Sequence, residues 1–210
     1  MIRLLKSPAL IIVAIMGLSA CAAPHDVSRN APLDTMRPVV DLPSQDWSIQ
    51  EVAINVPRSL KVSEANSIKP FSDIVWRAEP LGDRHAQVQA LMERALSPVM
   101  RPRDGAATPV TVSIDVTRFH ALTERARYTI GGEHEIEFIL TVTHAQTGEI
   151  LSGPRPVDLT FMALGGQQAI AAEARGISQQ VRITQRLQQW ALDEFAMARP
   201  DVLVAARVTN

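Results

Sequence analysis

Hydrophobic and polar residues alternate along three stretches of this chain with the period of two that is typical of β-strands. The apolar positions of these stretches are Val110, Val112, Ile114 and Val116, then Ile136, Phe138, Leu140 and Val142, then Val157, Leu159 and Phe161. Polar side chains fill most of the positions between them, so each strand has one apolar and one polar face. This pattern predicts an antiparallel sheet that buries one face and exposes the other.

Two further extended segments precede these strands. Val52, Ile54 and Val56 again alternate with other residues, and Pro57 follows them directly. Residues 74–76, Ile-Val-Trp, form a shorter apolar run between two prolines. Both segments favour strands at the beginning of the folded region.

Two helices are indicated by apolar residues with helical spacing. In the first, the apolar stripe follows Asp83, a good amino-terminal cap, and ends before Pro98. The members of this stripe are Val88, Leu91, Met92, Ala95 and Leu96. The second helix is predicted over residues 177–198, before Pro200, and residues 167–175 form a separate short helix because Gly176 interrupts the pattern.

These elements predict an α+β fold: an antiparallel or mixed sheet of four or five strands with two main helices packed on one face. A single domain is expected over residues 47–199. Residues 200–210 form either a tail or an edge strand around Val202-Leu203-Val204, and the pattern does not choose between the two.

The amino terminus has the layout of a secretory signal peptide. Arg3 and Lys6 precede an apolar run from Ala9 to Leu18, interrupted only by Gly17. This run is about half of the roughly 20 residues that a membrane-spanning helix needs. Residues 1–20 are therefore expected to be a cleaved signal.

The tetrad Leu18-Ser19-Ala20-Cys21 resembles the lipobox of bacterial lipoproteins, and Cys21 is the only cysteine of the chain. The resemblance implies that Cys21 is the lipid attachment site, with a diacylglyceryl thioether and an acylated new amino terminus. Residues 21–46 contain four prolines and no apolar period, which predicts an extended tether. By the same resemblance, Ala22 after the cysteine favours the outer membrane and a domain facing the periplasm.

Composition excludes several classes of function. Removing residues 1–20 leaves 19 basic and 22 acidic side chains, since Arg3 and Lys6 are the only charged residues in that segment. This balance argues against a nucleic-acid-binding protein. With Cys21 lipidated, no thiol remains for a disulfide, a nucleophile or a metal ligand.

The most charged local pattern lies between the first two long strands. Glycines at 131 and 132 suggest a β-hairpin, and a three-residue loop would place Arg127 opposite Glu137. This register predicts a protruding hairpin with a ladder of arginine and glutamate on its solvent-exposed face. The four candidate contact residues for a partner are Arg118, Arg127, Glu135 and Glu137.

No catalytic or metal site is expected. Alternation places His134 on the opposite face from Glu133, Glu135 and Glu137, and no second histidine follows four residues later as in a zincin helix. No G-x-S-x-G, P-loop or dinucleotide-binding motif occurs. The chain is therefore expected to be a non-enzymatic protein without a cofactor.

Several strings in the expected domain resemble a family of uncharacterised alphaproteobacterial lipoproteins, a domain of unknown function. They include residues 56–60 (VPRSL), 73–77 (DIVWR), 82–88 (GDRHAQV) and 115–124 (DVTRFHALTE). The order of elements also looks like that of small envelope lipoproteins that accompany lipid-transport ABC systems. This looser resemblance implies an adaptor without an active site.

The resulting expectation is a lipid-anchored, non-catalytic envelope lipoprotein. Its partners would be the bilayer, through Cys21, and an envelope transporter or assembly protein. The alternative is a module that binds a small ligand or lipid in a pocket between the long carboxy-terminal helix and the sheet.

Overall fold

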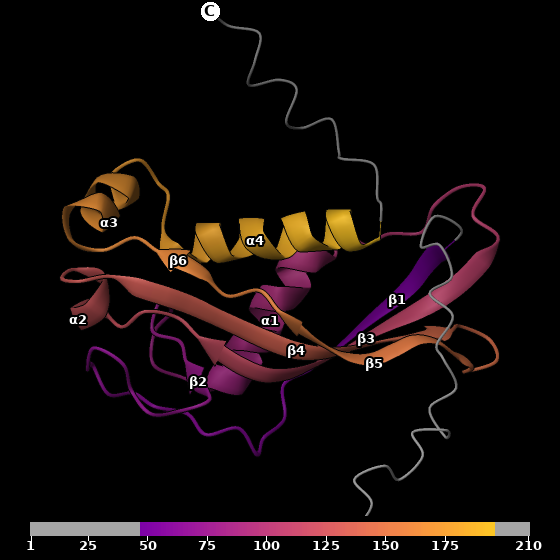
Figure 1. Ribbon diagram of the computed structural model, residues 1–210, viewed down its shortest axis with the longest axis horizontal. Helices are drawn as coiled ribbons and strands as arrows, with labels where there is room; N and C mark the ends of the chain where they lie inside the picture. Colours follow the sequence, from indigo (N-terminus) through magenta and orange to yellow (C-terminus); the bar gives the residue numbers. More distant parts are fainter. Residues whose placement is uncertain (1–46, 196–210) are drawn as a thin grey trace, which may run out of the picture. The chain divides into compact units, whose positions relative to one another are not determined.

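The computed structural model describes residues 47–195 of the chain (Figure 1). The expected signal segment, Cys21, the tether and the tail 200–210 lie outside the described residues. The described part has the order β-β-α-β-α-β-β-β-α-α, which is an α+β fold as the alternation predicted.

Four strands form the main path of a mixed sheet in the order β1 (Trp47–Asn55), β3 (Thr108–His120), β4 (Gly132–His144) and β5 (Ile150–Asp158). β1 and β3 run parallel, whereas β3 with β4 and β4 with β5 run antiparallel. Two short strands complete the six: β2 (Ile74–Val75) pairs with the end of β3, and β6 (Phe161–Ala163) pairs with the start of β4. The parallel pair requires a crossover, which contains helix α1 (Arg84–Leu96).

The third alternating stretch is divided between two strands. β5 ends at Asp158, whose side chain accepts a hydrogen bond from the backbone N–H of Thr160 at 2.8 Å. This local turn interrupts the strand at Leu159 and Thr160, after which β6 continues along β4 in the register of β5, with Phe161 opposite His134. The sheet therefore has more strands than the sequence pattern separates.

A β-bulge in β3 preserves the burial pattern at its far end. The pairing with β4 shifts between Val116 and Arg118, so Val116 lies opposite Phe138 and Phe119 lies opposite Ile136. Thr117 is the extra residue, which has no partner on β4. Without it, strict alternation would turn Arg118 toward the apolar face. The bulge places Phe119 in the core and Arg118 on the polar face.

The predicted hairpin around Gly131 is wrong. β3 ends at His120, and the segment after it forms the short helix α2 (Glu124–Arg127). Thr123 caps this turn by accepting a hydrogen bond from Ala126 N–H at 3.1 Å, and the Gly131 N–H donates back to the Ala126 carbonyl at 2.8 Å. A helical turn thus satisfies backbone groups that the hairpin would have paired across strands, and Arg127 does not lie opposite Glu137.

Helix α1 has the predicted cap, whereas the second main helix begins at residue 179 instead of the predicted 177 and ends at residue 194. Asp83 accepts a hydrogen bond from Ala86 N–H at the start of α1. Ser178 does the same for Val181 N–H at the start of α4 (Gln179–Glu194). The short helix α3 (Gly166–Glu173) is separate from α4, because Gly176 has a φ of 78° between them.

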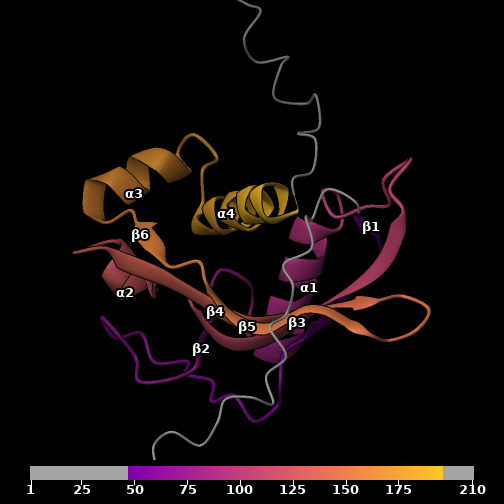
Figure 2. The same ribbon diagram turned by 45° about the vertical axis from the view of Figure 1, so that its right-hand side comes forward.

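One continuous core joins α1 and α4 to the apolar face of the sheet (Figure 2). All five members of the predicted α1 stripe are buried, as are the predicted apolar positions of β3 and β4. Trp190 of α4 packs edge-to-face on Phe138 of β4, with ring centroids 4.9 Å apart. The opposite face of the sheet is polar, in agreement with the one-sided pattern.

Among residues 47–195, no helix is both long and apolar enough to cross a lipid bilayer.

Candidate functional site

The polar face of the sheet carries a compact ion-pair cluster at the paired ends of β3 and β4. The guanidinium of Arg118 and the ammonium of Lys69 both contact the carboxylate of Glu135. Burial raises the pKa of the Glu135 carboxyl, but the hydrogen bonds from Lys69 and Arg118 outweigh it and hold this pKa below its ordinary value. Two of the four candidate contact residues, Arg118 and Glu135, therefore lie together, although in a register that the sequence analysis did not predict.

The segment between β1 and β2 is held against this cluster. Arg118 donates to the carbonyl of Ser72 at 3.1 Å, and the ring Nε2 of His120 lies 3.0 Å from the carbonyl oxygen of Pro70. The backbone N–H of Ile74 also donates to the Lys61 carbonyl at 2.9 Å. Two side chains of β3 thus fix the backbone on both sides of Phe71.

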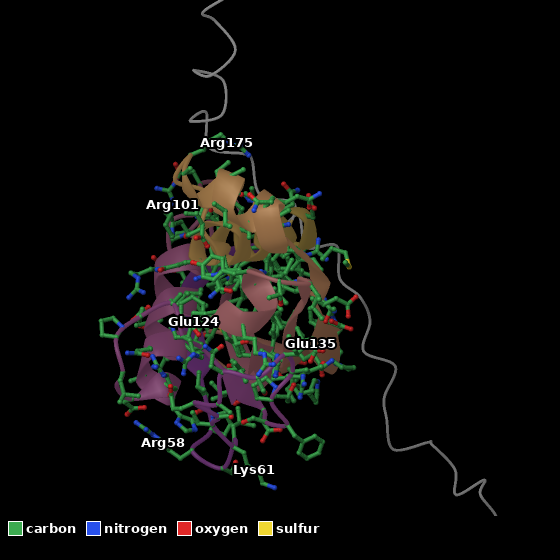
Figure 3. The ribbon with its side chains drawn as sticks, turned by 90° about the vertical axis from the view of Figure 1, so that its left-hand side faces the viewer. Arg58, Lys61, Arg101, Glu124, Glu135 and Arg175 are labelled. Carbon is green, nitrogen blue, oxygen red and sulfur yellow. The ribbon has the colours of Figure 1, made fainter. Side chains whose placement is uncertain are left out.

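Phe71 is fully exposed, with a relative accessibility of 104%, although its neighbours Pro70 and Ser72 are buried. Figure 1 shows this purple segment on the side of the sheet away from α4, and Figure 3 places Lys61 and Arg58 at the end of the domain opposite Arg175. An aromatic ring held in water by a fixed backbone has no packing role within the described domain. The ring is therefore accessible to another molecule.

The other two candidate residues do not join this cluster. Arg127, on α2, forms an ion pair with Glu173 of α3, with 3.0 Å between Nη1 and Oε1. Its guanidinium also lies over the ring of Tyr128. Glu137 lies opposite Arg118 and Asp158 in the registers of β3 and β5, but no ion pair involves it among the described residues.

A second charged cluster was not found by the sequence analysis. The buried guanidinium of Arg84 donates to both carboxylate oxygens of Glu64, at 2.6 and 3.0 Å. The hydrogen bond to Glu64 raises the pKa of Arg84, and the same bond lowers the pKa of Glu64. Arg77 bridges from Glu64 to Glu124 of α2. No sequence signal indicates this cluster, because its members are separated by up to 60 residues.

A narrow pocket opens where α2, α3 and the first turn of α4 meet the start of β4. It contains about 230 Å³ of space between atoms, including the part open to solvent, and has room for about one water molecule. Figure 1 shows α2, α3 and β6 gathered at this end of the sheet. The polar residues that line it are His134, Arg127, Glu173, Gln179 and Arg182.

His134 is the most deeply buried ionisable residue of this pocket, with a relative accessibility of 1%. Burial lowers its pKa to about 3, and the charges of Arg182 and Arg127 act in the same direction. Its ring packs against Phe161, with centroids 5.0 Å apart. As predicted, it lies on the opposite face of β4 from Glu133, Glu135 and Glu137.

Within residues 47–195, no three histidine, cysteine, aspartate or glutamate side chains come close enough together to hold a metal ion.

Comparison with solved structures finds similar chains of low identity. Protein XCC0632 from Xanthomonas campestris, of the family DUF330, is 17% identical, with a TM-score of 0.38 over 73% of this chain and 88% of that one. A minor lipoprotein from Acinetobacter baumannii is 11% identical, with a TM-score of 0.29 over 71% of this chain and 96% of that one. PelC from Paraburkholderia phytofirmans, crystallised as a dodecamer, is 12% identical, with a TM-score of 0.28 over 70% of this chain and 89% of that one.

Comparison with curated proteins gives no match. Comparison with family models gives a match over residues 47–208, which includes the whole of the described domain. The chain therefore belongs to DUF6778, a family of unknown function.

Proposed function

We propose that this protein is a non-catalytic lipoprotein of the cell envelope that acts as an adaptor in the transport or assembly of lipids or other envelope components. Cys21 anchors it in the outer membrane, the tether 21–46 separates the domain from the bilayer, and the domain contacts another envelope protein in the periplasm. The lipobox-like tetrad at Cys21 supports the anchor.

The observation that carries the adaptor role is the exposure of Phe71 on an immobilised backbone. A partner that covers this ring gains apolar contact area, about 25 cal/mol for each Å² removed from water. The cost of ordering the segment is already met by the hydrogen bonds from Arg118 and His120 to the carbonyls on either side. Lys69, Glu135 and Arg118 beside it supply the polar rim that surrounds such a contact residue in protein interfaces.

The test is crosslinked affinity capture of the full-length protein from its own membranes, comparing the natural chain with Phe71→Asp. We expect the natural chain to recover subunits of an envelope transporter or assembly system and Phe71→Asp to lose them. Leu81→Asp is the matched control, since Leu81 is also strongly exposed, at 79%, but lies outside residues 70–72, whose backbone Arg118 and His120 hold in place. A Cys21→Ser variant shows whether capture also requires the anchor.

Equal recovery with Phe71→Asp and Leu81→Asp would refute the role of Phe71. If, in a chain that also carries Cys21→Ser, Phe71→Asp instead abolished binding to lipid vesicles while no protein partner was recovered, residues 70–72 would be a membrane contact and the adaptor role would be wrong.

The ligand-binding alternative depends on a pocket at one end of α4 only. The space beneath most of α4 is filled by Trp190, Leu187 and Ile183, all of which are buried. The polar pocket instead lies at the first turn of this helix, where Gln179 and Arg182 face His134 of β4.

A further inference from the structure

Buried polar atoms without partners are concentrated in the pocket between α2, α3 and α4. Among the described residues, six buried side-chain nitrogen or oxygen atoms have no hydrogen-bond partner. Five of them belong to residues that line this pocket: Arg127 Nε, His134 Nδ1, Glu173 Oε1, Gln179 Oε1 and Arg182 Nη1. Of these, Glu173 Oε1 is already in the ion pair with Arg127, which leaves four without any partner. Since an unsatisfied buried polar atom is costly, this concentration favours the binding of a polar group in the pocket.

The pocket offers hydrogen-bond donors from several elements. Arg127 Nε and Arg182 Nη1 carry N–H groups that no acceptor in the described part of the chain uses. The neutral ring of His134 can carry its proton on Nδ1, and rotation of the Gln179 amide turns its NH₂ group inward. Both His134 and Gln179 are more than nine-tenths buried, with 1% and 6% accessibility.

The charge of the pocket favours an anion. The carboxylate of Glu173 is balanced by Arg127 and accepts a hydrogen bond from the Tyr128 hydroxyl at 3.0 Å. Arg182 donates to the Met162 carbonyl at 2.8 Å, but no carboxylate in residues 47–195 lies within ion-pair distance of it. The amino terminus of α4 lies in the same place and adds its partial positive charge.

The size of the pocket limits what can enter. There is room for about one water molecule, so a single oxygen atom fits and the rest of a ligand remains at the mouth. The walls there include Leu164 and the half-exposed side chain of Ile177, which suit a ligand with an apolar part next to its charged group.

We propose that this pocket binds one oxygen of an anionic group, a phosphate or a carboxylate, and that Arg182 and Arg127 are its main donors. Charged hydrogen bonds of guanidinium groups to such oxygens are stronger than neutral ones, and two arginines on different elements fix the direction of approach. This site is separate from the surface around Phe71, so it does not depend on the adaptor role.

The test is titration of the full chain with inorganic phosphate and with acetate, followed by calorimetry and by NMR of the His134 and arginine side chains. We expect saturable binding that Arg182→Gln weakens by about tenfold or more, the loss typical of one charged hydrogen bond. Arg186→Gln is the matched control, because Arg186 lies one turn later on α4 and donates to the Leu159 carbonyl outside the pocket. Arg182→Lys keeps the charge but not the fork of donors, so it should also weaken binding, and it replaces Arg182→Gln if that variant does not fold.

A second arm identifies the source of the anion. The same variants, each combined with Cys21→Ser so that an acyl anchor does not itself insert into the bilayer, are tested on vesicles of phosphatidylglycerol and of phosphatidylcholine. Binding to phosphatidylglycerol alone, with loss in Arg182→Gln, would assign the site to a lipid headgroup, whereas binding of free phosphate or acetate assigns it to a soluble anion. If no anion or vesicle binds, or if Arg182→Gln and Arg186→Gln bind equally, the pocket holds only water and the proposal is wrong.

Discussion

His134 shows how much a single buried side chain depends on its surroundings. It interrupts an apolar pattern on β4 and packs against Phe161, in a region where the nearest charges are arginines. The folded protein therefore holds this ring neutral at every pH above about 4, because its pKa is about 3. Unfolding would return the pKa to about 6.5, the ordinary value for histidine.

This difference predicts a loss of stability in mild acid. Below pH 6.5 the unfolded chain takes up a proton that folded His134 does not, so the free energy of unfolding should fall as the pH decreases. Between pH 7 and pH 5 the expected contribution of His134 is about 2 kcal/mol. It is measured by urea unfolding at both pH values in the natural chain and in His134→Gln.

The His134→Gln variant should show a clearly smaller decrease over this range. Burial also lowers the pKa of His120, which acts in the same direction, so part of the decrease remains in the variant. If the free energy of unfolding decreased equally in the natural chain and in His134→Gln, the pH dependence would not come from His134.

Helix α1 and the segment before it are joined by one buried arginine. Arg84 begins α1 and donates to Glu64, to the carbonyls of Glu79 and Pro80, and to the side chain of Gln87. A cation at the first position of a helix is unfavourable for the helix dipole. The bidentate contact with Glu64 and the two carbonyls offset this, so Arg84 has a tertiary role that helical propensity does not explain.

Replacement of Arg84 by methionine should lower the free energy of unfolding by about 2–3 kcal/mol. It removes the bidentate donor of Glu64, which keeps only the longer contact with Arg77, and the donor to the Glu79 carbonyl. Arg94→Met on the same helix is the control: this side chain is 58% exposed and pairs with Glu79 at 3.4 Å. Its loss should amount to less than about 1 kcal/mol. Urea unfolding of the two variants would contradict this role of Arg84 if they lost equal stability.

At the scale of the whole domain, a single core couples both helices to the sheet. Trp47 on β1, Trp76 after β2 and Trp190 on α4 all belong to it, although they come from distant parts of the chain. Trp190 contacts both Phe138 and Phe195, so α4 is held by side chains from the sheet and from its own end. Such a core predicts one cooperative unfolding transition.

Trp190→Ala should lower the free energy of unfolding by about 3–5 kcal/mol. Fluorescence of the two remaining tryptophans and far-UV circular dichroism should still report one common midpoint in urea. Val181→Ala, at an α4 position that is 36% exposed, should lose less than about 1 kcal/mol. Separate midpoints for the two signals in Trp190→Ala would show that α4 unfolds independently of the sheet.

The sequence by itself determined the elements whose apolar residues repeat regularly. The α+β class, the stripe of α1, the cap at Asp83 and the buried positions of β3 and β4 all follow from local periodicity, and the structure confirms them. The break at Gly176 was also predictable, because a glycine between two apolar helical patterns is a local signal. Membership of a family of unknown function agrees with the resemblance found in the sequence.

Only the tertiary structure decided which distant charged residues meet. The hairpin prediction paired Arg127 with Glu137 through local register, whereas a helical turn at Thr123 sends Arg127 to Glu173 on α3. Arg118 reaches Glu135 only because a bulge shifts β3 by one residue. Ion pairs and unpaired polar atoms depend on long-range packing. They leave no periodic pattern in the sequence from which they could be predicted. The surface around Phe71 and the pocket at His134 therefore became visible only when the chain was folded.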